Sequence, residues 1–454
     1  MVEHIKTTTL WFLILLSVFL TYQIWTFQPE YAILKSTEYI DNTQIGLEKK
    51  LHEVIKPKQV ILHEEGKSFA SIDNSVFAQR FYEEYFGTPL EKFMIRPNLS
   101  PFHRINSDYK IEFIFPTSIP SEIFKDIYQM NHSDQLFISK IDRMVFALEK
   151  ERDKEIVRVK LISNDERVIV EANTNIPVSR FIEDIALNST NVFYEVFPFD
   201  IIDFGNGYRK TTYLPIEAMY LNSATYIAKP LPTDHFRQVL FSDPNFVKHY
   251  LQSNGEESFT DGNRMVNILQ GGNILRYINP TFGDLVERNN KHVIFSALDF
   301  LNGHGGFTSS FYFDSLKTFG TSEEVTFRLF IGGLPVYSTN IFEVNNLFEI
   351  TLHRGNGNQI EQYVRPMFIM DEEPINISKS TRLPSGKELI EALENKEEFE
   401  RSLLTDINYG FTMIMRQSFV VLEPRWFIQY NGNWQVVHIA EEVDDSEAIT
   451  NGLE

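Results

Sequence analysis

The chain has 454 residues, of which 43% are hydrophobic and 14% aromatic, and this composition excludes a largely disordered protein. The 62 Asp and Glu outnumber the 42 Lys and Arg, and the resulting net charge of −20 repels phosphate backbones and argues against nucleic-acid binding. The absence of cysteine excludes disulfides, thiolate nucleophiles and Cys-based metal sites.

The first predicted element is a transmembrane helix at residues 10–27. As a helix rising about 1.5 Å per residue, this apolar stretch spans about 27 Å, close to the roughly 30 Å of bilayer hydrocarbon. A cleaved signal peptide needs small residues after its apolar core, but aromatic residues occupy those positions here. The sequence therefore favours a retained anchor whose aromatic side chains settle at the membrane interface: Tyr22, Trp25 and Phe27.

The charges beside this helix predict its orientation. The leader, residues 1–9, carries Lys6, whereas the first basic residue after the helix is Lys35. By the positive-inside rule the N-terminus should lie in the cytoplasm and the bulk of the chain outside the cell. No second apolar run approaches the length of a span, so the sequence predicts a single-pass protein of the cell membrane that signals through a partner.

One stripe of the predicted helix is a candidate contact with a partner helix. Its members recur at spacings of three and four and so share one face: Leu10, Ile14, Ser17, Thr21 and Ile24. Ser17 and Thr21 form a small-x-x-x-small pattern, which allows the close approach on which helix association in lipid depends. The alternative is that both hydroxyls bond back to carbonyls of their own helix and have no role in association.

The remainder is predicted to be α+β, with antiparallel sheets divided over three extracytoplasmic domains. Compact domains run about 100–200 residues, so a chain of this length exceeds one core. After a linker at residues 28–49, the expected domains are residues 50–190, 191–281 and 282–440. Residues 441–454 carry acidic residues without basic ones and predict a frayed tail.

The first domain should contain a half-buried strand and a meander. Residues 110–115 alternate apolar and polar side chains with the period of two that is typical of a strand. A helix is expected to begin at Pro120–Ser121. Residues 143–148, 155–162 and 167–172 then predict three antiparallel strands.

The second domain is expected to combine short helices with hairpins. The helices are predicted at residues 234–241 and 243–251, the latter with Ser242 as its N-cap. The dipeptides Asp261-Gly262 and Gly271-Gly272 accept positive φ angles and predict tight turns between strands.

The third domain has the clearest patterns. Val325, Phe327, Leu329 and Ile331 are predicted to face one way on a strand and Thr326 and Arg328 the other, and residues 348–352 repeat the alternation. Ser385 and Glu388 form a capping box that opens a helix. Asn431-Gly432 predicts the turn of a closing hairpin.

Motifs for catalysis are incomplete. The NGHGGF sequence at residues 302–307 resembles the oxyanion loop of lipases, but the G-x-S-x-G elbow is missing, so a glycine-rich turn is expected. Residues 107–110 match S-x-x-K yet lead into a strand, which favours a surface turn. None of the 11 histidines has HExxH spacing, so no metal and no cofactor is predicted. A carboxylate pair for glycoside hydrolysis is left open.

Three stretches carry a resemblance to a known family. They are the anchor with its ending LLSVFLTYQIWTFQPEY, the segment KPKQVILHEEGKSF, and the C-terminal PSGKELIEAL and VLEPRWFIQYNGNWQ. In these stretches and in total length the chain resembles the YycH family, membrane-anchored regulators that accompany the WalK/WalR two-component system of low-GC Gram-positive bacteria.

The resemblance implies three extracytoplasmic α+β domains without enzymatic activity, the last of them similar to YycI, a related single-pass protein. It also implies that this protein and YycI contact the sensor histidine kinase WalK through their membrane helices and so adjust cell-wall metabolism. Restraint and support of the kinase are both open. The competing hypotheses are an extracellular cell-wall-modifying hydrolase and a ligand-binding sensor domain.

Overall fold

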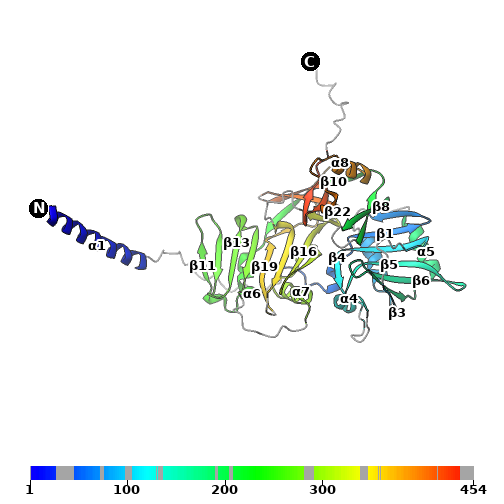
Figure 1. Ribbon diagram of the computed structural model, residues 1–454, viewed down its shortest axis with the longest axis horizontal. Coiled ribbons are helices and arrows are strands. Elements are labelled where there is room, and N and C mark those ends of the chain that lie inside the picture. Colours follow the sequence, from blue (N-terminus) through cyan, green and yellow to red (C-terminus); the bar gives the residue numbers. More distant parts are fainter. Residues whose placement is uncertain are drawn as a thin grey trace, which may run out of the picture.

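The computed structural model describes residues 2–26, 45–71, 76–97, 105–128, 130, 136–189, 193–203, 208–280, 291–337, 346–355, 357, 359–416 and 418–439. In these residues the fold is α+β with mostly antiparallel sheets, which confirms the predicted class. Figure 1 shows the N-terminal helix α1 (Val2–Thr26) apart from a β-rich body.

The first half of the body is a nine-stranded antiparallel sheet in the order β3-β7-β6-β5-β4-β1-β2-β8-β9. Its strands are β1 (Gln59–Glu64), β2 (Lys67–Ser71), β3 (Glu91–Arg96), β4 (Tyr109–Pro120), β5 (Lys140–Glu151), β6 (Lys154–Ser163), β7 (Val168–Asn173), β8 (Phe193–Asp203) and β9 (Tyr208–Pro215). The helices of this half are α2 (Leu51–Val54), α3 (Val76–Phe86), α4 (Ser121–Ile127) and α5 (Val178–Ser189). The predicted meander, β5 to β7, and the predicted helix start at Ser121 are both confirmed.

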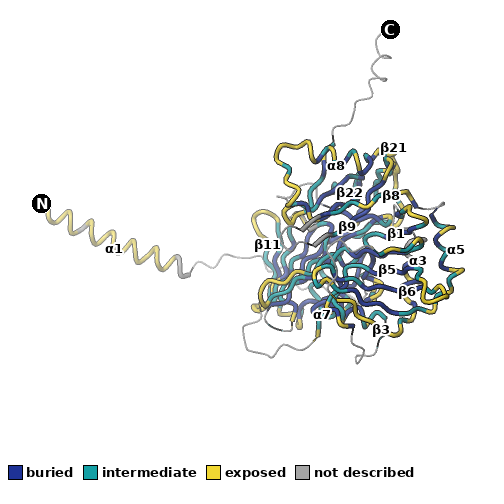
Figure 2. The backbone as a smooth tube through the Cα atoms, turned by 45° about the vertical axis from the view of Figure 1, so that its right-hand side comes forward, coloured by how far each residue is buried: buried dark blue, intermediate teal, exposed yellow. Residues whose placement is uncertain are grey.

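One face of this sheet is covered by helices and filled with aromatic rings. Tyr85 of α3 contacts the rings of Phe113, Phe146 and Phe181 at centroid distances of 6.4, 5.4 and 6.2 Å. Its hydroxyl donates to Asp184 of α5 at 2.7 Å, so the polar tip is satisfied while the ring is buried. Figure 2 shows the burial of this sheet, in which the middle parts of β5 and β6 are buried.

The opposite face contains a buried charge. Glu112 of β4 is 5% exposed and pairs with Arg143 of β5, and it also accepts from Tyr213 of β9 at 2.9 Å and lies 3.2 Å from a ring nitrogen of His63. Because β9 is the last strand of the order, its contact with β4 requires the sheet to curl over on itself. A second hydrogen bond, from Arg143 of β5 to the Thr211 carbonyl of β9 at 2.8 Å, also joins β9 to the middle of the sheet.

The second half is a fifteen-stranded sheet. Twelve strands follow one another in the order β11-β12-β13-β14-β19-β18-β16-β17-β22-β23-β10-β20, and the other three pair beside this path, β15 with β16, β21 with β10 and β24 with β23. Its strands are β10 (Met219–Pro230), β11 (Lys248–Leu251), β12 (Glu257–Thr260), β13 (Met265–Leu269), β14 (Ile274–Ile278), β15 (Phe311–Phe319), β16 (Ser322–Ile331), β17 (Leu334–Tyr337), β18 (Glu349–Arg354), β19 (Ile360–Pro366), β20 (Phe368–Met370), β21 (Asn376–Leu383), β22 (Leu404–Met415), β23 (Phe419–Tyr430) and β24 (Asn433–Val436). Its helices are α6 (Thr233–Leu240), α7 (Val293–Gly303) and α8 (Gly386–Glu394), with single 3₁₀ turns at Pro244–Phe246, Gln270–Gly272, Asn346–Phe348 and Arg401–Leu403.

The residues that were expected to form a central domain are divided between the two sheets. Strands β8 and β9 complete the nine-stranded sheet, whereas β10 to β14 belong to the fifteen-stranded one. A core cluster joins the two, in which Leu214 of β9 is buried with Leu389 and Leu393 of α8 and Trp426 of β23. The division into three domains stays a prediction.

The prediction of a helix at residues 243–251 is wrong. Asp243 instead accepts a hydrogen bond from the Asn245 amide at 3.0 Å and caps one 3₁₀ turn, and β11 follows directly. Lys248 to Leu251 pair with β12, where His249 stacks on Phe259 at 4.3 Å. Pairing with the next strand along the chain, β12, overrides the helical pattern here. Ser242 caps no helix, and its hydroxyl accepts from Arg264 at 2.8 Å.

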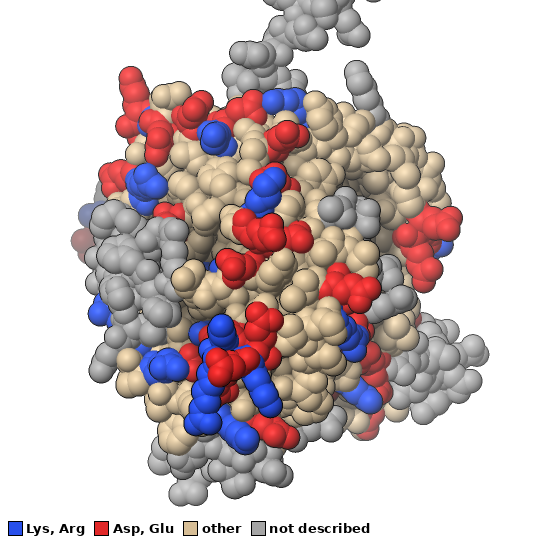
Figure 3. Space-filling view, turned by 90° about the vertical axis from the view of Figure 1, so that its right-hand side faces the viewer, with Lys and Arg blue, Asp and Glu red and all other residues tan. Residues whose placement is uncertain are grey.

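The other local signals are confirmed. Helix α6 begins and ends one residue before the predicted range, and Ser385 and Glu388 make both bonds of the capping box at the start of α8. The turns at Gly271-Gly272 and Asn431-Gly432 connect β13 to β14 and β23 to β24, with positive φ at all four residues. On the face drawn in Figure 3, basic and acidic side chains stand beside one another.

The buried Glu112 cluster gives a testable pH dependence. Burial alone would raise the pKa of Glu112, but the guanidinium of Arg143 and hydrogen bonds from His63 and Tyr213 outweigh burial and hold this pKa well below its usual range. A carboxyl with a depressed pKa in the folded state stabilises the fold above its unfolded pKa, and this contribution is lost as the pH falls below about 4.

We therefore expect Arg143→Met to lower the free energy of unfolding by about 3–5 kcal/mol at about pH 7, because it leaves a buried carboxylate unpaired. The difference from the native chain should shrink at about pH 3.5, where Glu112 of the variant is protonated. Urea unfolding of the detergent-solubilised chain, followed by circular dichroism, measures both values. Arg425→Met, at a pair that is 41% exposed, is the matched control. An equal loss at both pH values would contradict the assignment.

Candidate functional site

Helix α1 is long and apolar enough to cross a bilayer. The segment from Glu3 to Gln23 has 21 residues, none of which is buried against the rest of the described structure. At about 1.5 Å per residue this length spans about 32 Å, which matches bilayer hydrocarbon. Apolar side chains such as Phe12, 64% exposed, and Leu15, 64% exposed, surround it. The helix begins at Val2, so most of the predicted leader is helical as well.

The predicted contact stripe lies along this exposed helix. Leu10 and Ile14 are 59% and 44% exposed, and Ser17 and Thr21 are exposed too. The Thr21 hydroxyl donates to the Ser17 carbonyl at 2.8 Å, which is the back-bonding that the alternative interpretation expects. The hydroxyl donor of Thr21 is therefore used within α1. The Ile24 side chain lies outside the described residues.

Among the expected interface anchors, Tyr22 is 66% exposed. The side chain of Trp25 and all of Phe27 lie outside the described residues.

The last residues of the predicted linker are fixed to the second half of the body by the glycine-rich turn. Leu47 and Phe307 exchange two backbone hydrogen bonds of 2.9 Å, and the amide of Asn302 bonds the N–H and the carbonyl of Lys49 at 3.0 and 2.9 Å. A Cβ at Gly46 would lie 2.6 Å from the Phe307 carbonyl carbon, so only glycine fits this approach. The NGHGGF sequence is a turn, as predicted, and its role here is to dock the start of the body.

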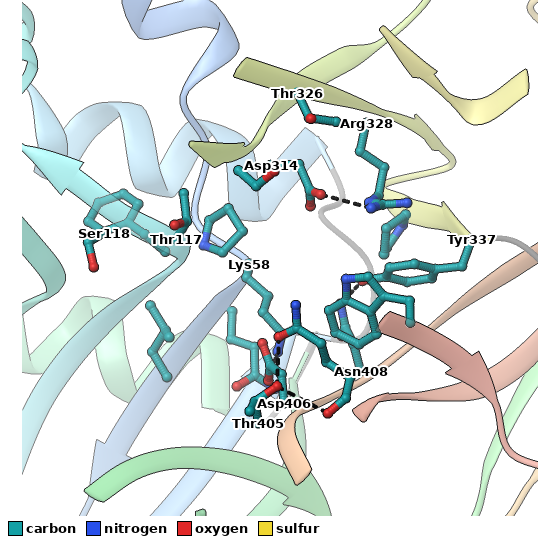
Figure 4. A pocket seen from close by; sticks show the side chains of 18 of the residues that line it. Lys58, Thr117, Ser118, Asp314, Thr326, Arg328, Tyr337, Thr405, Asp406 and Asn408 are labelled. Carbon is teal, nitrogen blue, oxygen red and sulfur yellow. Dashed lines mark hydrogen bonds and ion pairs between the residues drawn. The ribbon is translucent and has the colours of Figure 1, made fainter. Parts of the chain in front are cut away.

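A polar cleft of about 620 Å³ lies between the two sheets (Figure 4). Its walls come from β1, β4, β5 and β9 on one side and from β15 to β18, β22 and β24 on the other. The volume falls in the range of about 300–1,000 Å³ that is typical of small-molecule sites. The cleft is the second candidate site.

One end of the cleft is the Asp406 centre, formed by Lys58, Lys210 and Asp406. Asp406 is 3% exposed and pairs with the Lys58 ammonium on one oxygen and with Lys210 on the other at 2.9 Å. Burial lowers the pKa of Lys58 to about 8 although Asp406 opposes the shift. Burial would raise the pKa of Asp406, but the two ammonium groups lower it overall. With both lysines protonated, two cations on one carboxylate leave one positive charge.

The other end is the Arg328 centre, formed by Asp314, Arg328 and Glu349. The guanidinium is 4% exposed and binds Asp314 at 2.8 Å and Glu349 at 2.7 Å through one nitrogen. Burial raises the pKa of Glu349 although Arg328 opposes the shift. Arg328 also lies 4.5 Å from the ring centre of Tyr337, whose hydroxyl accepts from Asn408 at 2.9 Å. With both carboxylates ionised, this centre carries one negative charge.

Sequence reasoning did not find the cleft. The alternation on β16 is real, but Thr326 and Arg328, on the polar face of that strand, are also buried, because the sheets meet over them. Lys58 and Asp406 lie 348 positions apart, so no local motif joins them. The usable signal is an arginine and a threonine alternating within an otherwise apolar strand, which indicates a strand covered on both faces.

The residues of the S-x-x-K motif make structural contacts with backbone carbonyls. The hydroxyl of Ser107 donates to the carbonyls of Tyr109 and Leu148 at 2.9 and 2.7 Å, and Lys110 donates to the Ile105 carbonyl at 3.0 Å, so serine and lysine do not face each other. Within the described residues, no group of three His, Asp or Glu side chains is placed to hold a metal ion.

The fold therefore defines a mixed α/β protein of antiparallel sheets with an apolar N-terminal helix. Family models for the YycH protein N-terminal domain and C-terminal domain match residues 3–189 and 209–443. The chain belongs to the YycH family.

Two relatives support the assignment. The chain is 23% identical over 479 residues to the two-component system WalR/WalK regulatory protein YycH of Bacillus subtilis (strain 168), covering 100% of this chain and 99% of the relative. The crystal structure of YycH from Bacillus subtilis superposes with a TM-score of 0.69 at 19% identity, covering 87% of this chain and 98% of the other. The second likeness shows a shared fold.

Length and apolarity alone fit both a retained helix and a cleaved signal sequence, and the mass of the mature chain distinguishes them. We expect protein extracted from membranes to keep α1, because aromatic residues stand where signal peptidase needs small ones. Intact mass spectrometry should give the mass of the uncleaved chain. A mature chain beginning near residue 28 would show that the helix is removed.

Proposed function

We propose that this protein is a membrane-anchored, non-enzymatic regulator of a WalR/WalK two-component system. The match of both family domains along the chain carries the proposal, and the full-length relative is named as a regulatory protein of that system. Helix α1 supplies the anchor, with the N-terminus in the cytoplasm and both sheets outside the cell. Tyr22, Trp25 and Phe27 settle at the outer interface of the lipid bilayer.

The proposed partners are the sensor histidine kinase WalK and the related protein YycI. This protein contacts both through membrane helices. In lipid, burying leucine against leucine adds little, so association depends on close packing at small residues. The stripe of Leu10, Ile14, Ser17, Thr21 and Ile24 offers such a surface on α1. Through this contact the protein adjusts kinase activity and hence cell-wall metabolism.

The predicted orientation can be tested directly because the native chain has no cysteine. We expect Lys154→Cys, at the exposed β5–β6 turn, to react with a membrane-impermeant maleimide on intact cells lacking the wall. Glu3→Cys should react only after the membrane is permeabilised. The native chain provides the unlabelled control. Labelling of Glu3→Cys alone on intact cells would reverse the assignment.

The helix contact is tested by replacing the small residues of the stripe. Ser17→Leu with Thr21→Leu should preserve insertion, because both changes raise hydrophobicity, but should reduce co-purification with WalK or YycI by about tenfold, since bulk prevents close approach. Co-purification from crosslinked membranes, quantified by mass spectrometry, measures the loss.

The matched control for this pair is Phe12→Leu with Phe19→Leu, which changes two other positions of α1 and should leave co-purification intact. Equal recovery of both partners with the two double variants, together with equal output of the regulated genes, would remove the stripe as the contact. The proposed contact would then have to move to the ectodomain.

A further inference from the structure

The cleft contains two opposite charge centres that face each other. In Figure 4, Asp314 and Arg328 lie at one side and Lys58 and Asp406 at the other, with Tyr337 along the edge. The electrostatic effect of Asp314 reaches Lys58 across the cleft. With the lysines protonated and the carboxylates ionised, the Asp406 centre has one positive charge in excess and the Arg328 centre one negative charge. A ligand that bears both charges complements both ends.

The cleft also contains buried donors without acceptors. The Nε–H of Arg328 has no hydrogen-bond partner among the described residues, and neither has the Nε–H of Arg143 on the opposite wall. The side chain of Arg328 is 4% exposed and that of Arg143 is 11% exposed. A buried donor without an acceptor costs about 1–3 kcal/mol. Both guanidinium groups thus belong to cleft walls whose hydrogen bonding is incomplete.

The remaining walls combine hydroxyl, amide and aromatic groups. Tyr337 and Trp434 lie with their rings 4.6 Å apart, and both line the cleft. Thr117, Thr326 and Asn408 supply polar groups along its length. Alternating donors and acceptors beside an aromatic wall suit a peptide backbone with small side chains.

We propose that the cleft binds a short peptide with free termini, its carboxylate against Lys58 and Lys210 and its ammonium group against Asp314 and Glu349. A neutral sugar would leave both charge centres unmatched, and a simple anion would meet the acidic Arg328 centre. The cavity of about 620 Å³ has room for a peptide of a few residues. This site is independent of any contact made by α1.

The test uses the full-length chain in lipid nanodiscs and equilibrium dialysis against an equimolar mixture of tripeptides without cysteine. Mass spectrometry compares the two chambers. We expect retention of free tripeptides on the protein side, and about tenfold weaker retention of the same mixture after N-acetylation or after C-terminal amidation, because each cap removes one charge pair.

Two variants place the binding in the cleft. Lys210→Met and Asp314→Asn each remove one end, and these side chains are 28% and 14% exposed, so the fold should survive, as circular dichroism checks. Retention of free tripeptides should fall about tenfold in each. The matched controls, Lys67→Met and Asp299→Asn, change side chains 63% and 65% exposed outside the cleft and should retain the peptides.

Four results would overturn the proposal: no retention of the free mixture, equal retention of capped and free peptides, unchanged retention by both cleft variants, or preferential retention of a disaccharide mixture dialysed in parallel. None of them affects the role of α1, whose test measures co-purification with the kinase.

Discussion

The buried carboxylate of Asp406 is the interaction on which the arrangement of the two sheets depends. Asp406 belongs to β22 of the fifteen-stranded sheet, while Lys58 precedes β1 and Lys210 lies on β9 of the nine-stranded sheet. One side chain therefore pairs with cations from two segments of the other half. Without it, Lys58 would be a buried ammonium with no counterion, and breaking a buried pair in this way typically costs about 3–5 kcal/mol. The joint between the sheets is electrostatic at the point where the cleft opens.

The same joint explains why charge and cavity occur together. Apolar contacts join the halves elsewhere, as where Leu214 of β9 is buried with Leu389 and Trp426. An apolar joint closes completely because side chains pack to crystal-like density. A joint built from paired ions instead keeps polar groups that are best served by further hydrogen bonds, and a cavity of about 620 Å³ remains beside them. The cleft is thus a consequence of the ion pairs that join the two halves.

What the sequence predicts well is what local chemistry determines. Strands β4 and β16, the capping box at Ser385 and the turn at Asn431-Gly432 depend on neighbours within a few positions, and the structure has each of them. The prediction that β4 is only half-buried is wrong, because Glu112 and Ile114 on its other face are buried as well. The helix predicted at residues 243–251 fails because β12 recruits the segment into a sheet. The cleft was not predictable by the same means. Its charge centres join residues from β9, β16 and β22, which are far apart in the sequence and come together only when the two sheets pack against each other.

The docked start of the body lies close to the cleft in the sequence. Leu47 is docked on the turn after α7, and eleven positions later Lys58 enters the cleft beside Asp406. Between them, α2 buries Leu51 and Val54 in the main core, so the segment is held along its length. A segment fixed at both ends transmits displacement, because packed interiors deform little. Whatever changes the position of Lys58 therefore also acts on the docked segment from Leu47 to Val54.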